Sequence, residues 1–455
     1  MKRSQVDMLS GPLLKNVIAF SIPIILTSLL QLFFNAADLI VVGRFCGSIS
    51  VGAVGATGAI TNLIINVFIG LSVGAGVTVA QCTGAKDHDG VRKTVHTAVL
   101  TALIGGLILT FVGVAFSGTF LRLMDTPENV LPLSTVYMQI YFAGAVSMLV
   151  YNFGAAILRA VGDTKRPLYF LSIAGVVNVV LNLIFVTVFH MNVAGVALAT
   201  TISQTVSATL VVLTLMRRQD ACRLVLKELK IHGEQFGRII KIGLPAGIQG
   251  SLFAISNVLI QSSINSFGEI AVSGNAAAGN IEAFVWVMMN AFQQSALNFI
   301  GQNMGAKQYG RLKKIMWVCI GCVAAVGLVF GNLAFLFGRP LLGIYITDSA
   351  EAIEYGLIRM TFIAVPYLLC GVMDVATGCL RGVGKSMTAM IITIAGACGF
   401  RLFWIYTIFR IPAMHTPHSL YMSYPISWAM TFAVELICFI AVVKKLNANK
   451  EPEQA

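Results

Sequence analysis

The stretch "QCTGAK", Gln81 to Lys86, returns in the second half of the chain as "QNMGAK", Gln302 to Lys307. Two further pairs of matching stretches are "FSIP" at 20–23 with "IGLP" at 242–245, and "LRAVG" at 158–162 with "LRGVG" at 380–384. The pieces follow one another in the same order in both halves, at an offset of about 220 residues, which indicates an internal duplication. The fold is therefore expected to consist of two similar halves.

The composition places this duplication in a membrane. Of the 455 residues, 57% are hydrophobic and only 11% are charged, which is more apolar surface than one soluble core hides. A membrane-spanning helix needs about 20 mostly apolar residues, and the sequence predicts twelve such segments. Their approximate limits are 15–43, 51–81, 93–117, 131–156, 165–189, 193–216, 237–264, 273–303, 314–338, 352–379, 386–410 and 420–443.

The number of spans in each half predicts how the halves are related. Six spans return the chain to the side from which it started, so the two halves are parallel repeats about an axis along the membrane normal. We expect an all-α polytopic membrane protein, a two-lobed carrier with an N-terminal lobe at 1–216 and a C-terminal lobe at 237–455. A basic linker at 217–236 joins them on the cytoplasmic side.

The basic residues predict the orientation. The net charge is +12, but 25 of the 31 Lys and Arg residues fall on one side of the twelve-span arrangement, as the positive-inside rule predicts for cytoplasmic segments. The exceptions are Arg44, Arg122, Arg339, Arg359, Arg401 and Arg410. This pattern argues for a multi-pass protein of the cytoplasmic membrane with both termini inside, and against a protein that binds nucleic acid.

Signals of enzymatic chemistry are weak. "GCLRGVGKS", Gly378 to Ser386, resembles a phosphate-binding loop, but the first glycine of that motif would have to stand at position 379, which is Cys379. The pair His415 and His418 fits a solvated loop better than a metal site. We therefore expect no enzymatic activity, no metal centre and no cofactor.

One carboxylate stands out in "FFNAADLIVVGRF", Phe33 to Phe45. Asp38 lies within the first predicted span, and the repeat places Ile260 at the equivalent position of the second half. The fold therefore does not need an acid there. A carboxylate at membrane depth is costly unless it is hydrated, paired or protonated, and usually faces a functional cavity. The alternative is a protonated Asp38 that forms a structural hydrogen bond to a neighbouring amide.

Several further stretches carry a family resemblance. They are "NAADLIVVGRFC" at 35–46, the paired "QCTGAK" and "QNMGAK" loops, "LRAVGDTKRP" at 158–167, "NVVLN" at 178–182 and "GVALATTISQ" at 195–204. In this order and spacing the chain, from about residue 10 to 445, resembles the multidrug and toxic compound extrusion (MATE) family. The resemblance implies a secondary carrier that couples drug export to H⁺ or Na⁺.

The resemblance also implies a cation-coupling cluster in the N-terminal lobe. Its members would be Asp38, Asn152, Asn178, Asn182 and Thr200. Asn178 and Asn182 are spaced i, i+4 and share a helix face, although each could equally be an amide that only joins helices. One branch of the family carries a second aspartate where this chain has Asn182. A cluster with a single acid favours H⁺ over Na⁺, because one carboxylate offsets less of the desolvation of a bound metal cation.

The C-terminal lobe offers candidates for a second cavity or an ion pair, namely Asn257, Glu282, Asp374 and Arg401. In another branch of the family an aspartate precedes the "LRG" turn by about ten residues. That position is Cys370 here, and Asp374 lies one turn closer. Asp374 could face the same cavity, or Asp374 or Glu435 could neutralise Arg401.

Two functions of different classes remain from the sequence. The first is a cation-coupled antiporter that exports amphipathic, often cationic drugs or toxins by alternating access. The alternative is a flippase for lipid-linked glycans or lipids. The predicted twelve spans and an acidic and amide cavity favour the exporter, whose expected partners are small organic molecules and membrane lipid, acting as a monomer. A receptor or channel is less compatible with a full-length repeat of two lobes.

Overall fold

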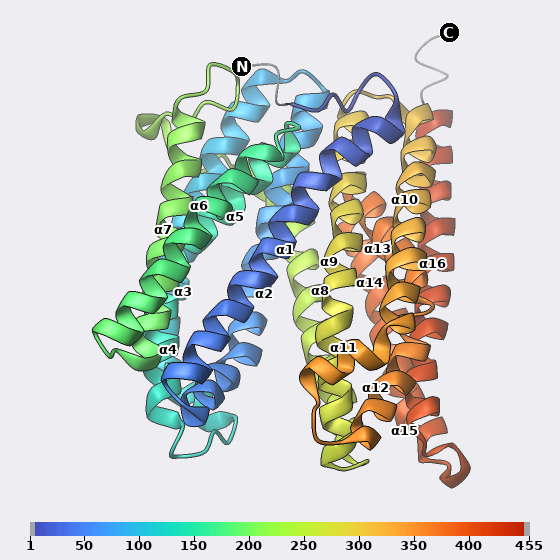
Figure 1. The fold of residues 1–455 in the computed structure, drawn as a ribbon. Coiled ribbons are helices and arrows are strands. Elements are labelled where there is room, and N and C mark those ends of the chain that lie inside the picture. The colour runs from blue at the N-terminus through green and yellow to red at the C-terminus, as the bar shows by residue number, and fades with distance from the viewer. Residues whose placement is uncertain (1–4, 450–455) are drawn as a thin grey trace. The chain divides into compact units, whose positions relative to one another are not determined.

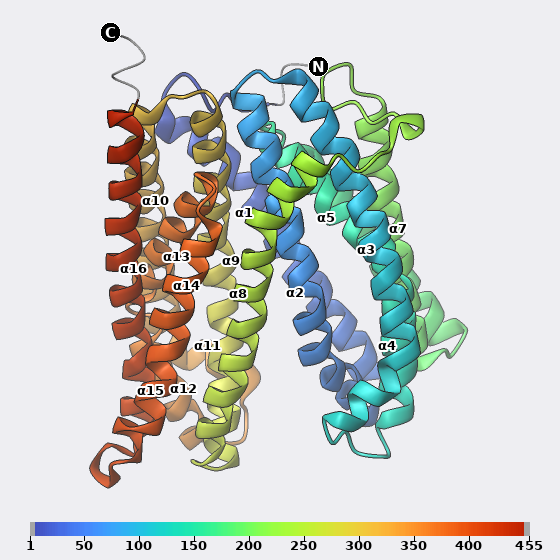
Figure 2. The ribbon, with the colours of Figure 1, turned by 180° about the vertical axis from the view of Figure 1, so that it is seen from behind.

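A computed structural model describes residues 5–449, and in this range the chain consists of helices joined by short connections, without strands (Figures 1 and 2). The helices of the first half are α1 (Leu13–Phe45), α2 (Ser48–Gly84), α3 (His88–Leu123), α4 (Leu131–Ala143), α5 (Ala145–Ala160), α6 (Lys165–Leu183), the π-helix η2 (Ile184–Val188), α7 (Asn192–Met216) and the 3₁₀ turn η3 (Leu226–Glu228). Those of the second half are α8 (Gly233–Asn265), α9 (Glu269–Gly305), α10 (Tyr309–Leu336), α11 (Gly338–Tyr345), α12 (Ala350–Phe362), α13 (Tyr367–Gly382), α14 (Ser386–Thr393), the π-helix η4 (Ile394–Gly399), α15 (Phe400–Tyr406), the 3₁₀ turns η5 (Ile408–Arg410) and η6 (Pro412–Met414), and α16 (Pro417–Ala448).

These helices provide the twelve predicted spans. In the described part of the chain, nine helical segments are long and apolar enough to cross a membrane. Two further spans are bent pairs, α4 with α5 at 48° and α12 with α13 at 49°. The remaining span is α9, which has 37 residues but carries many polar side chains. The sequence did not predict the two bends or the short helix α11.

The chain divides into two compact units. Among the described residues, one comprises 5–6 and 26–251, and the other comprises 7–25 and 252–449. The first part of α1 thus belongs with the second half of the sequence, and the first part of α8 belongs with the first half. The predicted lobes at 1–216 and 237–455, with a linker at 217–236, follow the sequence repeat rather than these packing boundaries and stay a prediction.

The two units repeat one packing plan. In the first, α5 packs against α2, α3 and α7, and in the second α13 packs against α9, α10 and α16. Each unit also has a bend before its central helix, at Gly144 or at 363–366, and a π-helix in its fifth span. Equivalent helices thus have equivalent neighbours, as expected of the internal duplication.

The duplication extends to single backbone angles. Lys86 and Lys307, which end the "QCTGAK" and "QNMGAK" stretches, have φ angles of 57° and 55°. Residues other than glycine seldom adopt this left-handed conformation. Gly162 and Gly384 follow with φ angles of 88° and 84°. The matching motifs therefore form matching turns at one end of each unit.

In each unit, the helix segment that comes from the other half of the sequence, the first part of α1 or of α8, packs through small side chains. In the first unit, a Cβ added to Gly70 on α2 would lie 2.2 Å from the backbone nitrogen of Gly247 on α8, so the two helices touch through their backbones. In the second unit, the hydroxyls of Ser21 on α1 and Ser295 on α9 are buried and 2.7 Å apart. Small residues commonly allow such close packing between membrane helices.

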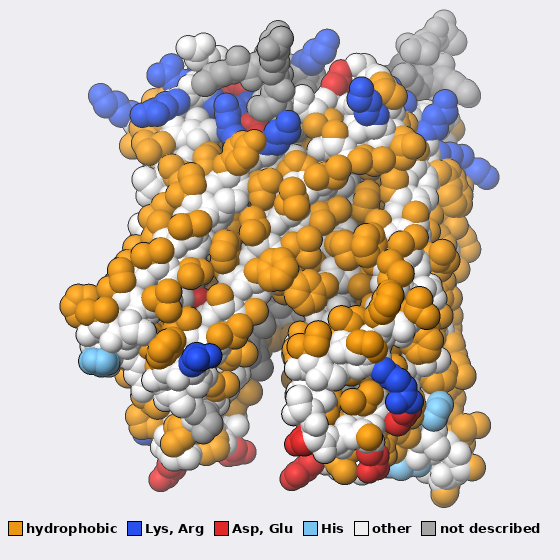
Figure 3. All heavy atoms as spheres, viewed as in Figure 1, with side chains coloured by type: hydrophobic (Ala, Val, Ile, Leu, Met, Phe, Trp, Pro, Cys, Tyr) orange, Lys and Arg blue, Asp and Glu red, His pale blue; other side chains and the backbone are white. Residues whose placement is uncertain are grey.

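The surface fits a membrane environment. Large apolar side chains are exposed along the helices, for example Phe111 on α3 at 71% and Ile437 on α16 at 67%. In Figure 3, hydrophobic side chains cover the middle of the helices, Lys and Arg gather toward one end, and Asp and Glu are prominent at the other. Exposed apolar surface of this extent marks contact with lipid or with partners. The chain termini, 1–4 and 450–455, lie outside the described residues.

Candidate functional site

Four of the predicted site residues lie together in the first unit. Asp38 comes from α1, Asn178 and Asn182 from α6, and Thr200 from α7. Asn182 donates its amide to Asp38 Oδ1, and the Thr200 hydroxyl lies 3.4 Å from Asp38 Oδ2. Asn178 links the other two, since its amide nitrogen is 3.3 Å from Thr200 Oγ1 and its oxygen is 3.3 Å from the amide nitrogen of Asn182. We call these four residues the Asp38 cluster.

The partners of Asp38 are neutral. Within residues 5–449, no Lys or Arg forms an ion pair with Asp38. Asn182 is completely buried, and its side-chain oxygen has no hydrogen-bond partner among the described residues. A buried acceptor without a protein partner can accept a hydrogen bond from a water molecule or bind an ion. The cluster thus contains one carboxylate and, next to it, the side-chain oxygen of Asn182, which accepts no hydrogen bond from the described residues.

The Thr200 hydroxyl can serve Asp38 in both charge states. Its oxygen lies 3.0 Å from the carbonyl oxygen of Val196 as well as 3.4 Å from Asp38. A hydroxyl carries one proton and two lone pairs. It can donate to a charged Asp38, or it can donate to Val196 and accept a hydrogen bond from a protonated Asp38.

A small cavity of about 120 Å³ adjoins the cluster. Its lining includes polar residues that the sequence analysis missed, namely Gln31, Asn35, Ser203, Gln204 and Ser207. Two of them could have been found by helical spacing: Asn35 precedes Asp38 by three residues, and Gln204 follows Thr200 by four. The volume is enough for a few water molecules or a cation, but not for a drug-sized molecule.

Asn152, the fifth predicted member, does not join the hydrogen bonds of the cluster. It lies on α5, and its amide donates to the carbonyl oxygen of Met148 at 2.8 Å. This bond to the preceding turn of its own helix satisfies the amide locally. It also does not line the small cavity.

The second unit contains a different arrangement around Glu282. This buried carboxylate on α9 pairs with Arg359 on α12, whose Nη2 lies 2.6 Å and Nε 3.1 Å from Glu282 Oε2. Arg359 Nη1 donates to Asn275 at 2.6 Å, and the Tyr421 hydroxyl donates to the same oxygen at 2.9 Å. Glu282 thus has a full cationic partner. The sequence did not predict this pair, because Arg359 was counted only among the outer basic residues.

The other residues proposed for the second half are not brought together. Arg401 forms no ion pair with Asp374 or Glu435 in the described part of the chain; its Nε donates to Ser427 on α16 at 2.9 Å. Glu435 instead accepts from Thr377 at 2.8 Å and Thr393 at 2.9 Å. The structure therefore does not show the neutralisation of Arg401 that the sequence analysis offered as one of two alternatives. The reason is distance along α16, since Glu435 lies eight residues beyond Ser427, or about 12 Å. Asp374 is part-buried on α13, and Asn257 is exposed on α8.

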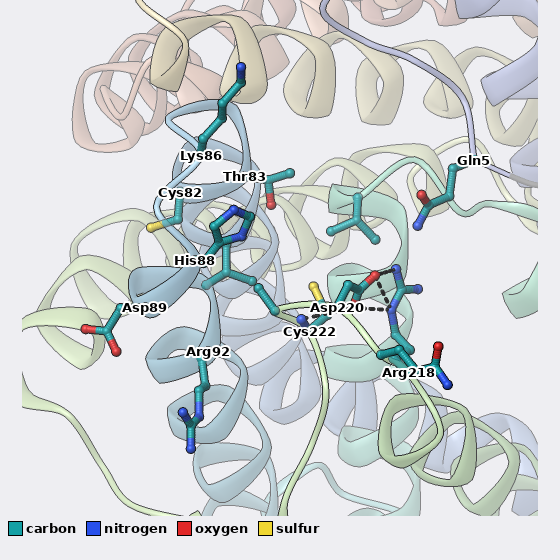
Figure 4. A pocket seen from close by; sticks show the side chains of 14 residues that line it. Gln5, Cys82, Thr83, Lys86, His88, Asp89, Arg92, Arg218, Asp220 and Cys222 are labelled. Carbon is teal, nitrogen blue, oxygen red and sulfur yellow. Dashed lines mark hydrogen bonds and ion pairs between the residues drawn. The ribbon is translucent and has the colours of Figure 1, made fainter. Parts of the chain in front are cut away.

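A larger cavity of about 660 Å³ lies at the end of the first unit that holds the "QCTGAK" turn (Figure 4). Several charged side chains around it form ion pairs, namely Arg218 with Asp220, Arg92 with Glu228 and Asp89 with Lys93. Burial acts to raise the pKa of Asp220, but the hydrogen bond and charge of Arg218 hold it below its usual range. Burial raises the pKa of Cys222 to about 12, so its thiol stays protonated at neutral pH. This cavity is the larger of the two, but most of the charged side chains that line it are already held in local ion pairs.

The similarity of the chain to known proteins agrees with this geometry. The family model MatE matches residues 23–184 and 245–407, one match in each half of the duplication. The chain belongs to the MatE family. Members of this family are transporters, so the chain is a transporter and not an enzyme, as the sequence predicted.

Relatives and solved structures extend the MatE match to nearly the whole chain. The chain is 29% identical to "Probable multidrug resistance protein YpnP" of Bacillus subtilis (strain 168), over 88% of each protein. It is 22% identical to "Multidrug export protein MepA" of Staphylococcus aureus (strain NCTC 8325 / PS 47), over 95% of this chain and 93% of that protein. An outward-facing multidrug resistance MATE family transporter has the same fold, with a TM-score of 0.91, 22% identity and coverage of 98% and 99% of the two chains. The twelve-helix fold of two six-helix repeats is thus that of MATE transporters.

Proposed function

We propose that this transporter exports amphipathic, often cationic drugs or toxins across the cytoplasmic membrane in exchange for a cation, by alternating access between two lobes. The names of its MatE relatives, a multidrug resistance protein and a multidrug export protein, support the substrate class. The observation that carries the coupling proposal is the Asp38 cluster. Asp38 is a membrane-embedded acid whose described hydrogen-bond partners, Asn182 and Thr200, are neutral.

The same cluster favours H⁺ over Na⁺ as the coupling ion. Thr200 can reverse its hydrogen bond when Asp38 gains a proton, so no new ligand is required. A sodium ion would need several oxygens at close range and would have to lose water, with only one carboxylate to offset its charge. Protonation, in contrast, removes the buried charge.

Protonation would also loosen the contact between α1 and α6. Hydrogen bonds to a charged carboxylate are about twice as strong as those between neutral groups. When Asp38 is neutral, its bond to Asn182 weakens, and the second part of α1 becomes freer to move within the first unit. Proton binding can then shift the balance between two conformations, provided that they differ in their affinity for the proton.

Purified protein in liposomes tests this function. Vesicles are loaded with ethidium and given either a proton gradient without sodium, acidic outside, or an inward sodium gradient at equal pH. We expect efflux with the proton gradient and little with sodium alone. Transport driven only by sodium would refute the proposed ion, and flipping of a labelled lipid-linked glycan without ethidium efflux would favour the flippase instead.

The orientation is part of the proposal. Basic residues such as Lys86 and Lys307 would face the cytoplasm, and Asp125 and Asp348 the outside. Single cysteines at these four positions, in a chain whose own cysteines are replaced, should be labelled by a membrane-impermeant maleimide from the corresponding side. Labelling of either lysine position from outside in intact cells would contradict it.

A further inference from the structure

Arg401 is a buried cation of the second unit that the Asp38 cluster does not explain. It is 3% exposed and stands at the second position of α15, directly after the π-helix η4. Its Nε donates to Ser427, and its guanidinium carbon lies 4.0 Å from the centre of the Tyr424 ring and 5.5 Å from that of Trp428. These three partners all come from α16. One hydroxyl and two aromatic rings therefore surround the charge.

The charge of Arg401 has no counter-ion among residues 5–449. Its Nη2 atom is buried and has no hydrogen-bond partner there. Glu282 is paired with Arg359, and Glu435 accepts hydrogen bonds from two threonines through Oε1 and forms no ion pair with Arg401 in this range. A buried charge is normally paired and fully hydrogen-bonded, and contact with aromatic rings offsets only part of the loss of water. The arrangement lacks an anion.

The duplication indicates that the fold does not require this cation. At the offset that aligns "LRAVG" with "LRGVG", the residue equivalent to Arg401 is Val179 on α6, one position after Asn178. The fifth span therefore carries amides in one unit and a guanidinium in the other.

We propose that Arg401 binds a carboxylate of the transported molecule, with Tyr424 and Trp428 packing against its aromatic body. This selects zwitterionic amphiphiles, which carry both a cationic and an anionic group, and it rests on the proposed export function. The buried Nη2, which has no hydrogen-bond partner among the described residues, would donate to an oxygen of this carboxylate. Tyr367, whose ring centre is 5.8 Å from that of Trp428, extends the aromatic surface.

The test compares a xanthene dye that has a free carboxylate with the methyl ester of the same dye. The two probes share the ring system and differ only at the carboxyl group, which is negatively charged in the acid and capped by a methyl group in the ester. In liposomes, wild-type protein should export the acid faster than the ester. In Arg401→Gln the ratio of the two rates should fall by about tenfold or more, as expected for loss of a charge-assisted hydrogen bond. The matched control is Arg410→Gln, an exposed arginine of the same span, which should keep the ratio.

A binding measurement on wild-type protein tests the proposal without relying on transport or on the Arg401→Gln variant. In detergent, the acid should raise the melting temperature of wild-type protein more than the ester does, and benzoate should compete with the acid only. If wild-type protein exports neither dye, the proposed export function fails, whereas the binding comparison still decides the role of Arg401. Equal stabilisation by acid and ester, or an unchanged ratio in Arg401→Gln, would overturn the proposal.

Discussion

Asp38 in the first unit and Glu282 in the second are both membrane-embedded carboxylates, but their surroundings differ. Asp38 meets an amide and a hydroxyl, Asn182 and Thr200. Glu282 accepts hydrogen bonds from two nitrogens of the Arg359 guanidinium, Nε and Nη2. Because Arg stays protonated in proteins, its pairing favours the charged form of Glu282. The neutral partners of Asp38 can accommodate both forms.

This difference separates a structural acid from a candidate for coupling. An acid that drives transport must gain and lose a proton or a cation in each cycle, which a permanent counter-ion opposes. The Glu282–Arg359 pair instead joins α9 to α12, with Asn275 and Tyr421 completing the hydrogen bonds. The comparison thus predicts loss of stability at one site and loss of coupling at the other.

The largest effect on stability is expected at the ion pair. In Arg359→Met, Glu282 loses its cation while buried, which should lower the free energy of unfolding by about 3–5 kcal/mol. Detergent titration of the purified variants measures this. The double variant with Glu282→Gln should recover most of the loss. The control is Arg339→Gln, which breaks an exposed pair with Glu354 and should cost at most about 1 kcal/mol. A loss in Arg359→Met no greater than that of the control would remove the distinction between the sites.

The next effect concerns ion choice. Asn182→Asp places a second carboxylate beside Asp38. The two negative charges together would offset the cost of removing water from a bound sodium ion. We expect sodium-driven ethidium efflux to appear in this variant, at a rate at least about tenfold above that of wild-type protein, which corresponds to a gain of about 1.4 kcal/mol. The control is Asn152→Asp, the same change at an amide that bonds to Met148 outside the cluster. Sodium-driven efflux that appears equally in both variants would show that the cluster does not determine ion choice.

A smaller effect is expected at the hydroxyl of the cluster. Thr200→Val removes one hydrogen bond to Asp38 at nearly constant volume, so proton-driven efflux should fall by about threefold to tenfold, in line with the net value of such a bond. The adjacent Thr201 donates to the carbonyl oxygen of Ile140 at 3.1 Å. Thr201→Val therefore removes a similar bond outside the cluster, and its efflux rate should stay within about twofold of wild type. Equal losses at both positions would assign Thr200 a packing role.

The sequence predicted the fold well because its signals are long and repeated. Apolar runs predicted the spans, and matching motifs such as "QCTGAK" and "QNMGAK" predicted the duplication, which the matching turns at Lys86 and Lys307 confirm. The bends at Gly144 and at 363–366 were missed, because both lie inside apolar runs that read as single spans. The placement of residues 7–25 with the second half was missed, because it depends on contacts between helices far apart in sequence.

The Asp38 cluster could be anticipated from an isolated acid, the i, i+4 spacing of the two asparagines and the family resemblance. The Glu282–Arg359 pair could not, because its residues lie on helices far apart in sequence, and no local spacing connects them. Asn152 shows the opposite case: its residue type suited the cluster, but its own helix offers a nearer acceptor, the Met148 carbonyl. Side-chain chemistry alone therefore overestimates the members of a buried polar site.

The central claim is that the charge of Asp38, and not that of Glu282, changes during transport. Asp38→Asn keeps the size of the side chain and can still form hydrogen bonds, but it cannot be charged. A pH-sensitive dye inside liposomes that contain wild-type protein should report proton entry as ethidium leaves. Asp38→Asn should be as stable as wild type yet show neither proton entry nor gradient-driven efflux above empty vesicles. Proton-coupled efflux that persists in Asp38→Asn would contradict the account and direct the search for the coupling acid to Asp374.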